Sequence, residues 1–238
     1  MKTTLIHLAI VFTFLAALAA QDTSNDGETR AARGRVASFV CTSLPKELEN
    51  PVTVMAGEDI SQVVLSKLSP SDPVRIPPDG VVRIVRKIAN PKDPEKPEYL
   101  TLAQATIPED VAKAVIILAP IEKTSNGLIF QTKVLNLAEI KGGDSMFLNM
   151  TTLKIGVELG QANILVEPGQ MKTHNPLGGS KTVSLPIRLS YFHPQRNEWA
   201  MITASTVALY STRRELCIFN WDKRFNRVDF ESITLPMM

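Results

Sequence analysis

Residues that carry chemistry in metal and redox sites are scarce in this sequence. Its 238 residues include only two cysteines and three histidines. His174 and His193, the two histidines beyond the N-terminal segment, lie far apart in polar stretches without a neighbouring cysteine. Because a zinc site usually takes three or four protein ligands at short spacings, the pattern predicts no metal site.

An excess of charge of one sign is also missing. Lysine and arginine together number 26 against 24 aspartates and glutamates, which gives a formal net charge of +2. Proteins that bind nucleic acid non-specifically present a strongly basic surface. The balance therefore predicts no nucleic-acid partner.

Recognisable catalytic and phosphate-binding motifs are absent as well. Ser43 to Lys46 matches S-x-x-K by letter, but Pro45 opposes the helix that would bring the lysine to the serine. Gly178 to Thr182 resembles the end of a phosphate-binding loop, yet a strand-like alternation follows where a helix is needed. No cofactor is expected. A pair of carboxylates needs only closeness in space, so a secreted hydrolase stays open as one alternative.

The N-terminus has the plan of a secretory signal. Lys2 precedes an apolar run from Leu5 to Leu18, and small residues end at Ala19-Ala20. The run is shorter than the roughly 20 residues that span a bilayer. We predict a cleaved signal peptide at residues 1–20, no membrane span after cleavage, and a periplasmic or secreted protein. Residues 21–34 are polar without an apolar period, which predicts a disordered lead-in.

The remainder, residues 35–238, has the patterning of strands. Val183, Leu185, Ile187, Leu189 and Tyr191 alternate with polar residues and Pro186, as in a strand with one buried face. Since proline cannot donate to a ladder, this strand is expected to lie at a sheet edge or to carry a bulge. About a dozen such short runs are separated by turn residues, among them Val81 to Ile88, Met146 to Glu158 and Ala200 to Tyr210. They predict an all-β, antiparallel β-sandwich, Ig-like or jelly-roll-like, with at most one or two short helices.

Domain organisation and some local structures stay open at this level. Either one sandwich or two packed sandwiches fit the length, with subdivision near residues 90–98 or 122–127, and we find no internal repeat at a fixed period. Asn126-Gly127 and the segment 193–198 favour hairpins. The apolar spacing after Asp59 fits a short helix or a strand.

One stretch resembles a known group of proteins. Met146 to Asn149, Ile155 to Gly160 and Ile164 to Gly169 are similar to segments of uncharacterised exported bacterial β-sandwich proteins of unknown function. The resemblance covers residues 146–169. It implies a sandwich exported to the cell envelope and implies no functional residues.

Cys41 and Cys217 lie near the two ends of the predicted folded region. Alternation places Cys41 on the side of Phe39, and Cys217 on the side of Phe219 and Trp221, so both thiols are expected to point inward. In an oxidising compartment such a pair is a disulfide candidate. The alternative is two separately buried thiols that behave as small apolar groups.

Aromatic residues are few, 6% of the chain, but eight of the twelve beyond residue 20 fall between Tyr191 and Phe230. Core packing of the last hairpins is one explanation. Stacking against a sugar is the other, with Trp199, Trp221 and Phe225 as the candidate residues.

These features lead to a ranked functional prediction. We expect a non-enzymatic, exported structural or protein-interaction module of the cell envelope, because chemistry-bearing motifs are missing and many strand edges are available. A carbohydrate-binding module that uses the C-terminal aromatics is the second hypothesis, with a polysaccharide as its partner. The sequence leaves the oligomeric state open.

Overall fold

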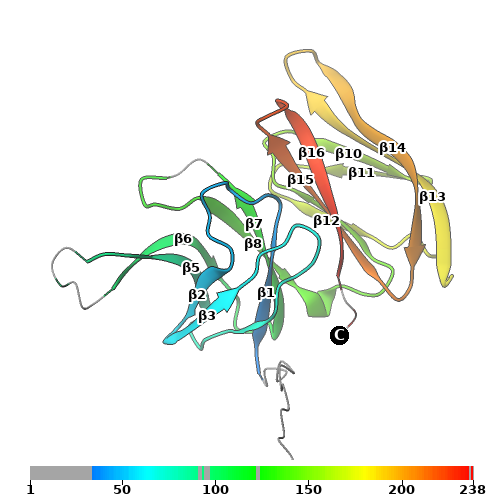
Figure 1. Ribbon diagram of the computed structural model, residues 1–238. Coiled ribbons are helices and arrows are strands. Elements are labelled where there is room, and N and C mark those ends of the chain that lie inside the picture. Colours follow the sequence, from blue (N-terminus) through cyan, green and yellow to red (C-terminus); the bar gives the residue numbers. More distant parts are fainter. Residues whose placement is uncertain (1–33, 91–92, 94–96, 122–123, 236, 238) are drawn as a thin grey trace, which may run out of the picture. The chain divides into compact units, whose positions relative to one another are not determined.

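The predicted all-β class is confirmed by a computed structural model, which describes residues 34–90, 93, 97–121, 124–235 and 237 (Figure 1). The expected signal peptide and nearly all of the expected lead-in lie outside the described residues. The only helical element in the described part is a 3-10 turn, η1 (Leu137–Glu139). The first eight strands are β1 (Val36–Cys41), β2 (Val52–Ala56), β3 (Asp59–Val63), β4 (Val74–Arg75), β5 (Val81–Ile88), β6 (Glu98–Thr106), β7 (Lys113–Pro120) and β8 (Phe130–Asn136). The second eight are β9 (Ser145–Asn149), β10 (Ile155–Leu159), β11 (Ala162–Val166), β12 (Met171–His174), β13 (Thr182–His193), β14 (Glu198–Tyr210), β15 (Arg214–Asp222) and β16 (Arg227–Leu235).

The sixteen strands form four sheets of four strands each. Sheet A has the order β4-β1-β7-β8 and sheet B the order β3-β2-β5-β6. Sheet C has the order β12-β9-β15-β16 and sheet D the order β11-β10-β13-β14. Most pairs are antiparallel, but β1 runs parallel to β7 and β9 runs parallel to β15. Sheets A and C are therefore mixed, whereas sheets B and D are purely antiparallel.

The two halves of the chain repeat one fold. Adding eight to each strand number of sheets A and B gives the order and the pairing directions of sheets C and D. Even the irregularities agree, since a bulge after Ile84 in the β5–β6 pair matches a bulge after Leu189 in the β13–β14 pair. We call residues 36–136 the first sandwich and residues 145–235 the second sandwich.

The registers make individual positions equivalent. Val54 lies opposite Ile84 as Val157 lies opposite Leu189. The glycines that follow β2 and β10, Gly57 and Gly160, both have positive φ, 65° and 59°. The spacing between equivalent residues differs from strand to strand, because the loops differ in length. For this reason the duplication was not visible as a repeat of fixed period.

Alternation of side chains across each strand produces three apolar cores. Phe39, Cys41 and Ile116 belong to the core between sheets A and B. Phe147, Cys217 and Phe219 belong to the core between sheets C and D. The opposite faces of sheets A and C, including Val115, Ile117, Leu148 and Ile218, bury each other in a third core. The described residues accordingly lie in one compact unit.

The expected subdivision points fall inside the first sandwich. Residues 91–92, 94–96 and 122–123 lie outside the described residues, but the strands on either side of each gap pair with one another, β5 with β6 and β7 with β8. The change from one sandwich to the other comes instead between β8 and β9, where η1 lies. Pairing of β7 with β8 and of β13 with β14 confirms the two predicted hairpins.

The strand predicted around Pro186 is present, but β13 is an inner strand of sheet D and not an edge. It does carry a bulge, which was the second alternative predicted, and this bulge lies after Leu189, away from the proline. Pro186 is tolerated because the last paired residue of β10, Leu159, lies opposite Ile187. At the next position the carbonyl of Pro186 accepts a hydrogen bond from Gly160 N–H, 2.9 Å, and a donor from the proline is not required.

The segment after Asp59, left open between helix and strand, is strand β3. Within the described ranges no helix has the length and apolarity to cross a membrane.

Candidate functional site

The first sandwich is closed along the side where β6 and β8 lie. Ile129 N–H donates to Leu102 O, 2.9 Å, and the Thr132 hydroxyl donates to Gln104 O, 2.8 Å. These bonds join the edge of sheet A to the edge of sheet B. Leu102 and Phe130 beneath them are buried, so water is excluded from this side of the core.

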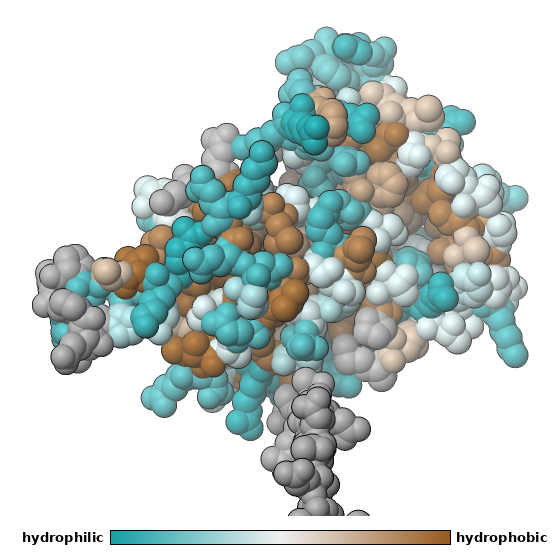
Figure 2. All heavy atoms as spheres, in the orientation of Figure 1, coloured by the Kyte–Doolittle hydropathy of each residue, from teal (hydrophilic) through white to brown (hydrophobic). Residues whose placement is uncertain are grey.

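The second sandwich is open along the equivalent side. A hollow of about 510 Å³ lies between sheets C and D, at the edges formed by β14 and β16. Figure 2 shows hydrophobic residues, in brown, at the surface of this part of the molecule. We call this hollow the edge groove. Its apolar lining is Met146, Phe147, Leu159, Ile187, Leu189, Val207, Ala208, Leu209, Cys217 and Phe230.

Different residues at equivalent positions explain why the β6–β8 side of the first sandwich is closed and the β14–β16 side of the second is open. Thr132, which lies opposite Leu118 on β7, is matched by Phe230, which lies opposite Phe219 on β15. Phenylalanine has no hydroxyl to donate to the neighbouring sheet. The Phe230 ring turns instead toward Phe219, with ring centroids 6.4 Å apart, and forms part of the groove wall.

The inward-facing positions of the β5–β6 and β13–β14 pairs change in the same direction. Ala105 of β6 is buried, whereas Ser205, the matching residue of β14, is exposed. Val82 of β5 is 1% exposed, while the matching Ile187 of β13 is only half-buried. Val183, Leu185 and Ile187 therefore face the core, as predicted, without being sealed in it.

The two cysteines belong to different cores. Cys41 points from sheet A toward sheet B and Cys217 points from sheet C toward sheet D. Because packed sheets lie about 10 Å apart and a disulfide needs Cα atoms within about 7 Å, no bond can form across the intervening core. Both thiols are free, so the disulfide interpretation does not hold. Burial raises the pKa of Cys41 to about 11, and burial raises the pKa of Cys217 further.

The three candidate stacking residues do not form one surface. Trp199 lines a shallow hollow of about 450 Å³ on the outer face of sheet D, with Glu158, Asn163 and Arg188. Its ring packs edge-on against Phe192, with centroids 5.6 Å apart. A Cβ at Gly156 would approach the Trp199 ring to 3.1 Å, so glycine leaves room for the ring at this place.

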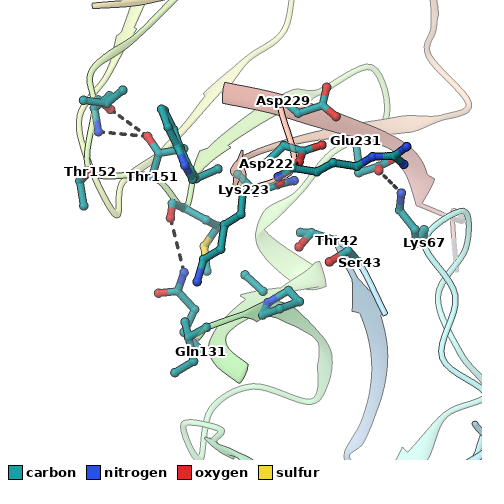
Figure 3. Close-up of a pocket in the computed structure, with 18 residues that line it drawn as sticks. Thr42, Ser43, Lys67, Gln131, Thr151, Thr152, Asp222, Lys223, Asp229 and Glu231 are labelled. Carbon is teal, nitrogen blue, oxygen red and sulfur yellow. Dashed lines mark hydrogen bonds and ion pairs between the residues drawn. The ribbon is translucent and has the colours of Figure 1, made fainter. Parts of the chain in front are cut away.

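Trp221 lines a different and larger hollow. This hollow, of about 980 Å³, is bordered by residues that follow β1 and β7 and by the β15–β16 turn (Figure 3). Phe225 lies in that turn, 56% exposed, between the guanidinium groups of Arg224 and Arg227, which are 5.0 and 5.3 Å from the ring centroid. Cation–π contact with two arginines stabilises the exposed ring without a ligand.

Two of the three carboxylates that line the larger hollow are engaged within the fold. Asp222 Oδ1 accepts hydrogen bonds from the backbone N–H groups of Arg224 and Phe225. Glu231 forms an ion pair with Lys67, drawn in Figure 3. A glycosidase needs two carboxylates free to act on one bond, so the hollow lends the hydrolase hypothesis little support. In the described part of the chain no three metal-binding side chains are grouped.

Comparison with known proteins does not assign the chain to a group. No protein-family model matches it, and no curated protein matches its sequence. The functional argument therefore depends on the geometry of the molecule itself.

The edge groove was missed at the level of sequence, although one signal was present. From Trp199 to Tyr210, twelve consecutive residues contain no charge and no proline. Edge strands of natural proteins usually carry charged residues or proline, which prevent pairing with other chains. We assigned this run to a strand without recognising that an unprotected strand of this length is a candidate binding edge.

Proposed function

We propose that this protein is an exported, non-enzymatic module of the cell envelope that binds another protein at the edge groove of its second sandwich. The observation that carries the proposal is the contrast between two copies of one fold in a single chain. The first copy joins β6 to β8 by hydrogen bonds, whereas the second leaves an apolar hollow between β14 and β16. Apolar surface of this kind on a soluble domain is typical of interaction sites.

Two features of the sequence support the compartment. The signal-like pattern of residues 1–20 favours export. The resemblance of residues 146–169 to exported β-sandwich proteins favours the cell envelope. Free, deeply buried thiols are compatible with an oxidising compartment, because neither cysteine can reach the other.

The test places a photo-crosslinking side chain in the groove. Ser205 is the position of choice, because it lines the groove and is exposed. The matched control is Gln104, which lies on the equivalent strand of the closed first sandwich and is also exposed. We expect irradiation of cells to give one discrete protein adduct from position 205 and none from position 104.

A second substitution makes the result specific to the groove. Thr203→Arg places a long charged side chain at a neighbouring lining position and is expected to abolish the adduct from position 205. Equal adducts from positions 205 and 104, or an adduct that survives Thr203→Arg, would contradict the proposal.

A carbohydrate-binding function is the second candidate, and Trp199 is the observation that favours it. Its ring lies 50% exposed beside Asn163, Glu158 and Arg188, which can hydrogen-bond hydroxyl groups. A tryptophan fluorescence titration against a panel of polysaccharides tests this function. The signal should disappear in Trp199→Ala and persist in Trp221→Ala, and a flat titration across the panel removes the hypothesis.

A further inference from the structure

β14 is a long edge strand that lacks charge and proline over most of its length. It has thirteen residues and, among the described strands, only β13 as a neighbour in its sheet. Its residues 199–210 carry no charge and no proline. The other long edge strand of the second sandwich, β16, carries Arg227, Asp229 and Glu231. β14 is therefore the edge that is best suited to accept a further strand.

The hydrogen bonds of β13 show which backbone groups of β14 are free. Ser211 N–H donates to Lys181 O at the end of the β13–β14 pair. In an antiparallel pair every second residue faces the partner with its N–H and C=O, so Ser205, Val207 and Leu209 face β13. The backbone groups of Ala204, Thr206 and Ala208 then point away from β13, toward the open edge.

The edge groove lies directly beside these free backbone groups. A strand added to β14 would direct alternate side chains toward the core side of sheet D. There they would meet Val207 of β14 and Phe230 of β16 across the groove. The remaining side chains would lie beside Ala204, Thr206 and Ala208, whose small exposed side chains leave the outer face unobstructed.

The charge of the lining indicates which side chains the groove accepts. Its charged members, Arg213 and Glu215, have partners within the fold, since Arg213 stacks on Tyr210 at 4.7 Å and Glu215 accepts a hydrogen bond from Thr234. The other lining residues are neutral. A buried charge without a partner is costly, so the groove favours uncharged, apolar side chains.

From these observations we infer that an extended segment of a partner protein adds to sheet D as a fifth strand, paired with β14, and inserts apolar side chains from alternate positions into the edge groove. The inference rests on the proposed function, because it specifies how the same groove binds protein. Main-chain pairing supplies affinity in such complexes, and the alternate pockets supply selectivity.

The probe is a synthetic peptide of about ten residues, the length of a long strand, in which leucine alternates with threonine and each end carries a lysine. The control peptide has the same composition with its leucines in one block. Amide hydrogen exchange measured by NMR reports on the protein. We expect the alternating peptide to protect the N–H groups of Ala204, Thr206 and Ala208, and those of Ser205 and Val207 to be protected with or without peptide.

Two substitutions separate backbone pairing from filling of the groove. Thr206→Pro removes a free N–H without breaking the ladder to β13. It should raise the dissociation constant of the alternating peptide by at least about tenfold, the equivalent of one backbone hydrogen bond. Thr206→Val keeps the N–H and is the matched control. Ser205→Arg obstructs the groove and should also abolish binding. Thermal unfolding of each variant shows that it is folded.

The outcomes distinguish the inference from the proposed function. If the crosslinked partner from position 205 survives Thr206→Pro and is lost only in Thr203→Arg, the groove binds protein but not as an added strand, and the inference is wrong. If the peptide binds as expected while cells give no groove-specific adduct, the proposed function fails.

Protection of the three edge amides by protein concentration alone would show pairing of two copies. Displacement of the peptide by a fatty acid, with no protection of these amides by either, would show an apolar small-molecule site. Both results would overturn the inference.

Discussion

The first and second sandwiches share strand order, pairing directions, a bulge and a glycine turn, yet one side is closed in the first and open in the second. The difference comes from few positions. Thr132 joins the two sheets through its hydroxyl, and its counterpart Phe230 packs inward against Phe219. Ala105 is covered, whereas Ser205 is exposed. A duplicated fold can thus keep one copy closed along a side where the other leaves part of its core open.

The largest expected difference concerns the cores themselves. Ile84→Ala in β5 removes a side chain that is 1% exposed, and should lower the free energy of unfolding by about 2–5 kcal/mol. Ile187→Ala on the equivalent strand β13 removes a half-buried side chain and should cost about half as much. Urea denaturation of the two variants measures both values. Equal losses would show that the second sandwich is sealed in solution.

The thiols provide a second, kinetic comparison. Cys41 is enclosed in the first sandwich and Cys217 lines the edge groove. Thiolate is the reactive form, and burial raises the pKa of both groups, so each thiol reacts only when its surroundings open. Because the second sandwich lacks the bonds that close the first, we expect a maleimide reagent at pH 8 to modify Cys217 before Cys41. Mass spectrometry of the digested protein gives the order, and labelling of Cys41 first would reverse our interpretation.

The same thiols make stability depend on alkaline pH. Burial raises the folded-state pKa of Cys41 from 9.0 to about 11, so above pH 9 the unfolded state loses its proton more readily than the folded state. Stability supplied by the protonated thiol is complete below pH 9 and declines as the pH rises toward 11. Cys41→Ala should flatten this part of the profile in urea denaturation measured from pH 7 to 11. An unchanged decline in the variant would assign it to other groups.

Much of the fold could be predicted from the sequence, because alternation of apolar residues directly reflects burial. β5 was predicted with its observed ends, and most other strands within a few residues. One error shows where the method stops. Residues 146–158 were assigned to one strand, but β9 and β10 are separated by a turn without glycine or proline. That turn is held by the buried Asn149, whose Nδ2 donates to Leu153 O, 2.7 Å, and to Val166 O, 2.9 Å. The bond to Val166 is long-range and leaves no local pattern. The local part of the turn, in which Thr151 N–H donates to Asn149 Oδ1, 2.9 Å, is an Asx turn that the sequence prediction did not use.

The candidate site was less predictable than the fold. Trp199, Trp221 and Phe225 are close in sequence and similar in chemistry, but Trp199 and Trp221 line different hollows and Phe225 lines neither of them. Whether a groove forms depends on which strand edges come together. In the first sandwich Thr132 bonds Gln104 and closes the equivalent side. Sequence periodicity indicates the face of a strand and says nothing of its neighbours. Only the register of the sheets shows that Thr132 and Phe230 are equivalent.

A smaller effect is expected where the first sandwich is held shut. Thr132→Val keeps the size of the side chain and removes the hydroxyl that bonds Gln104 O, which should lower the free energy of unfolding by about 1 kcal/mol. The amide of Ile129, bonded to Leu102 O on the same side, should exchange faster in the variant. Urea denaturation and hydrogen exchange measure the two effects. An unchanged exchange rate would mean that the backbone bond closes this side without help from Thr132.

The smallest expected difference lies in the turns that the two sandwiches share. Gly57 and Gly160 have φ of 65° and 59°, and a Cβ at either would meet its nearest neighbour at 3.3 Å. Left-handed backbone is unfavourable for alanine by roughly 1–2 kcal/mol, so Gly57→Ala and Gly160→Ala should each destabilise the protein by about that amount. The two losses, compared by urea denaturation, should agree with each other, because the β2–β3 and β10–β11 turns lie away from the open side. A markedly smaller loss for Gly160→Ala would mean that the looser packing of the second sandwich extends through all of sheet D, and that the edge groove is one part of a generally mobile half rather than a local opening between β14 and β16.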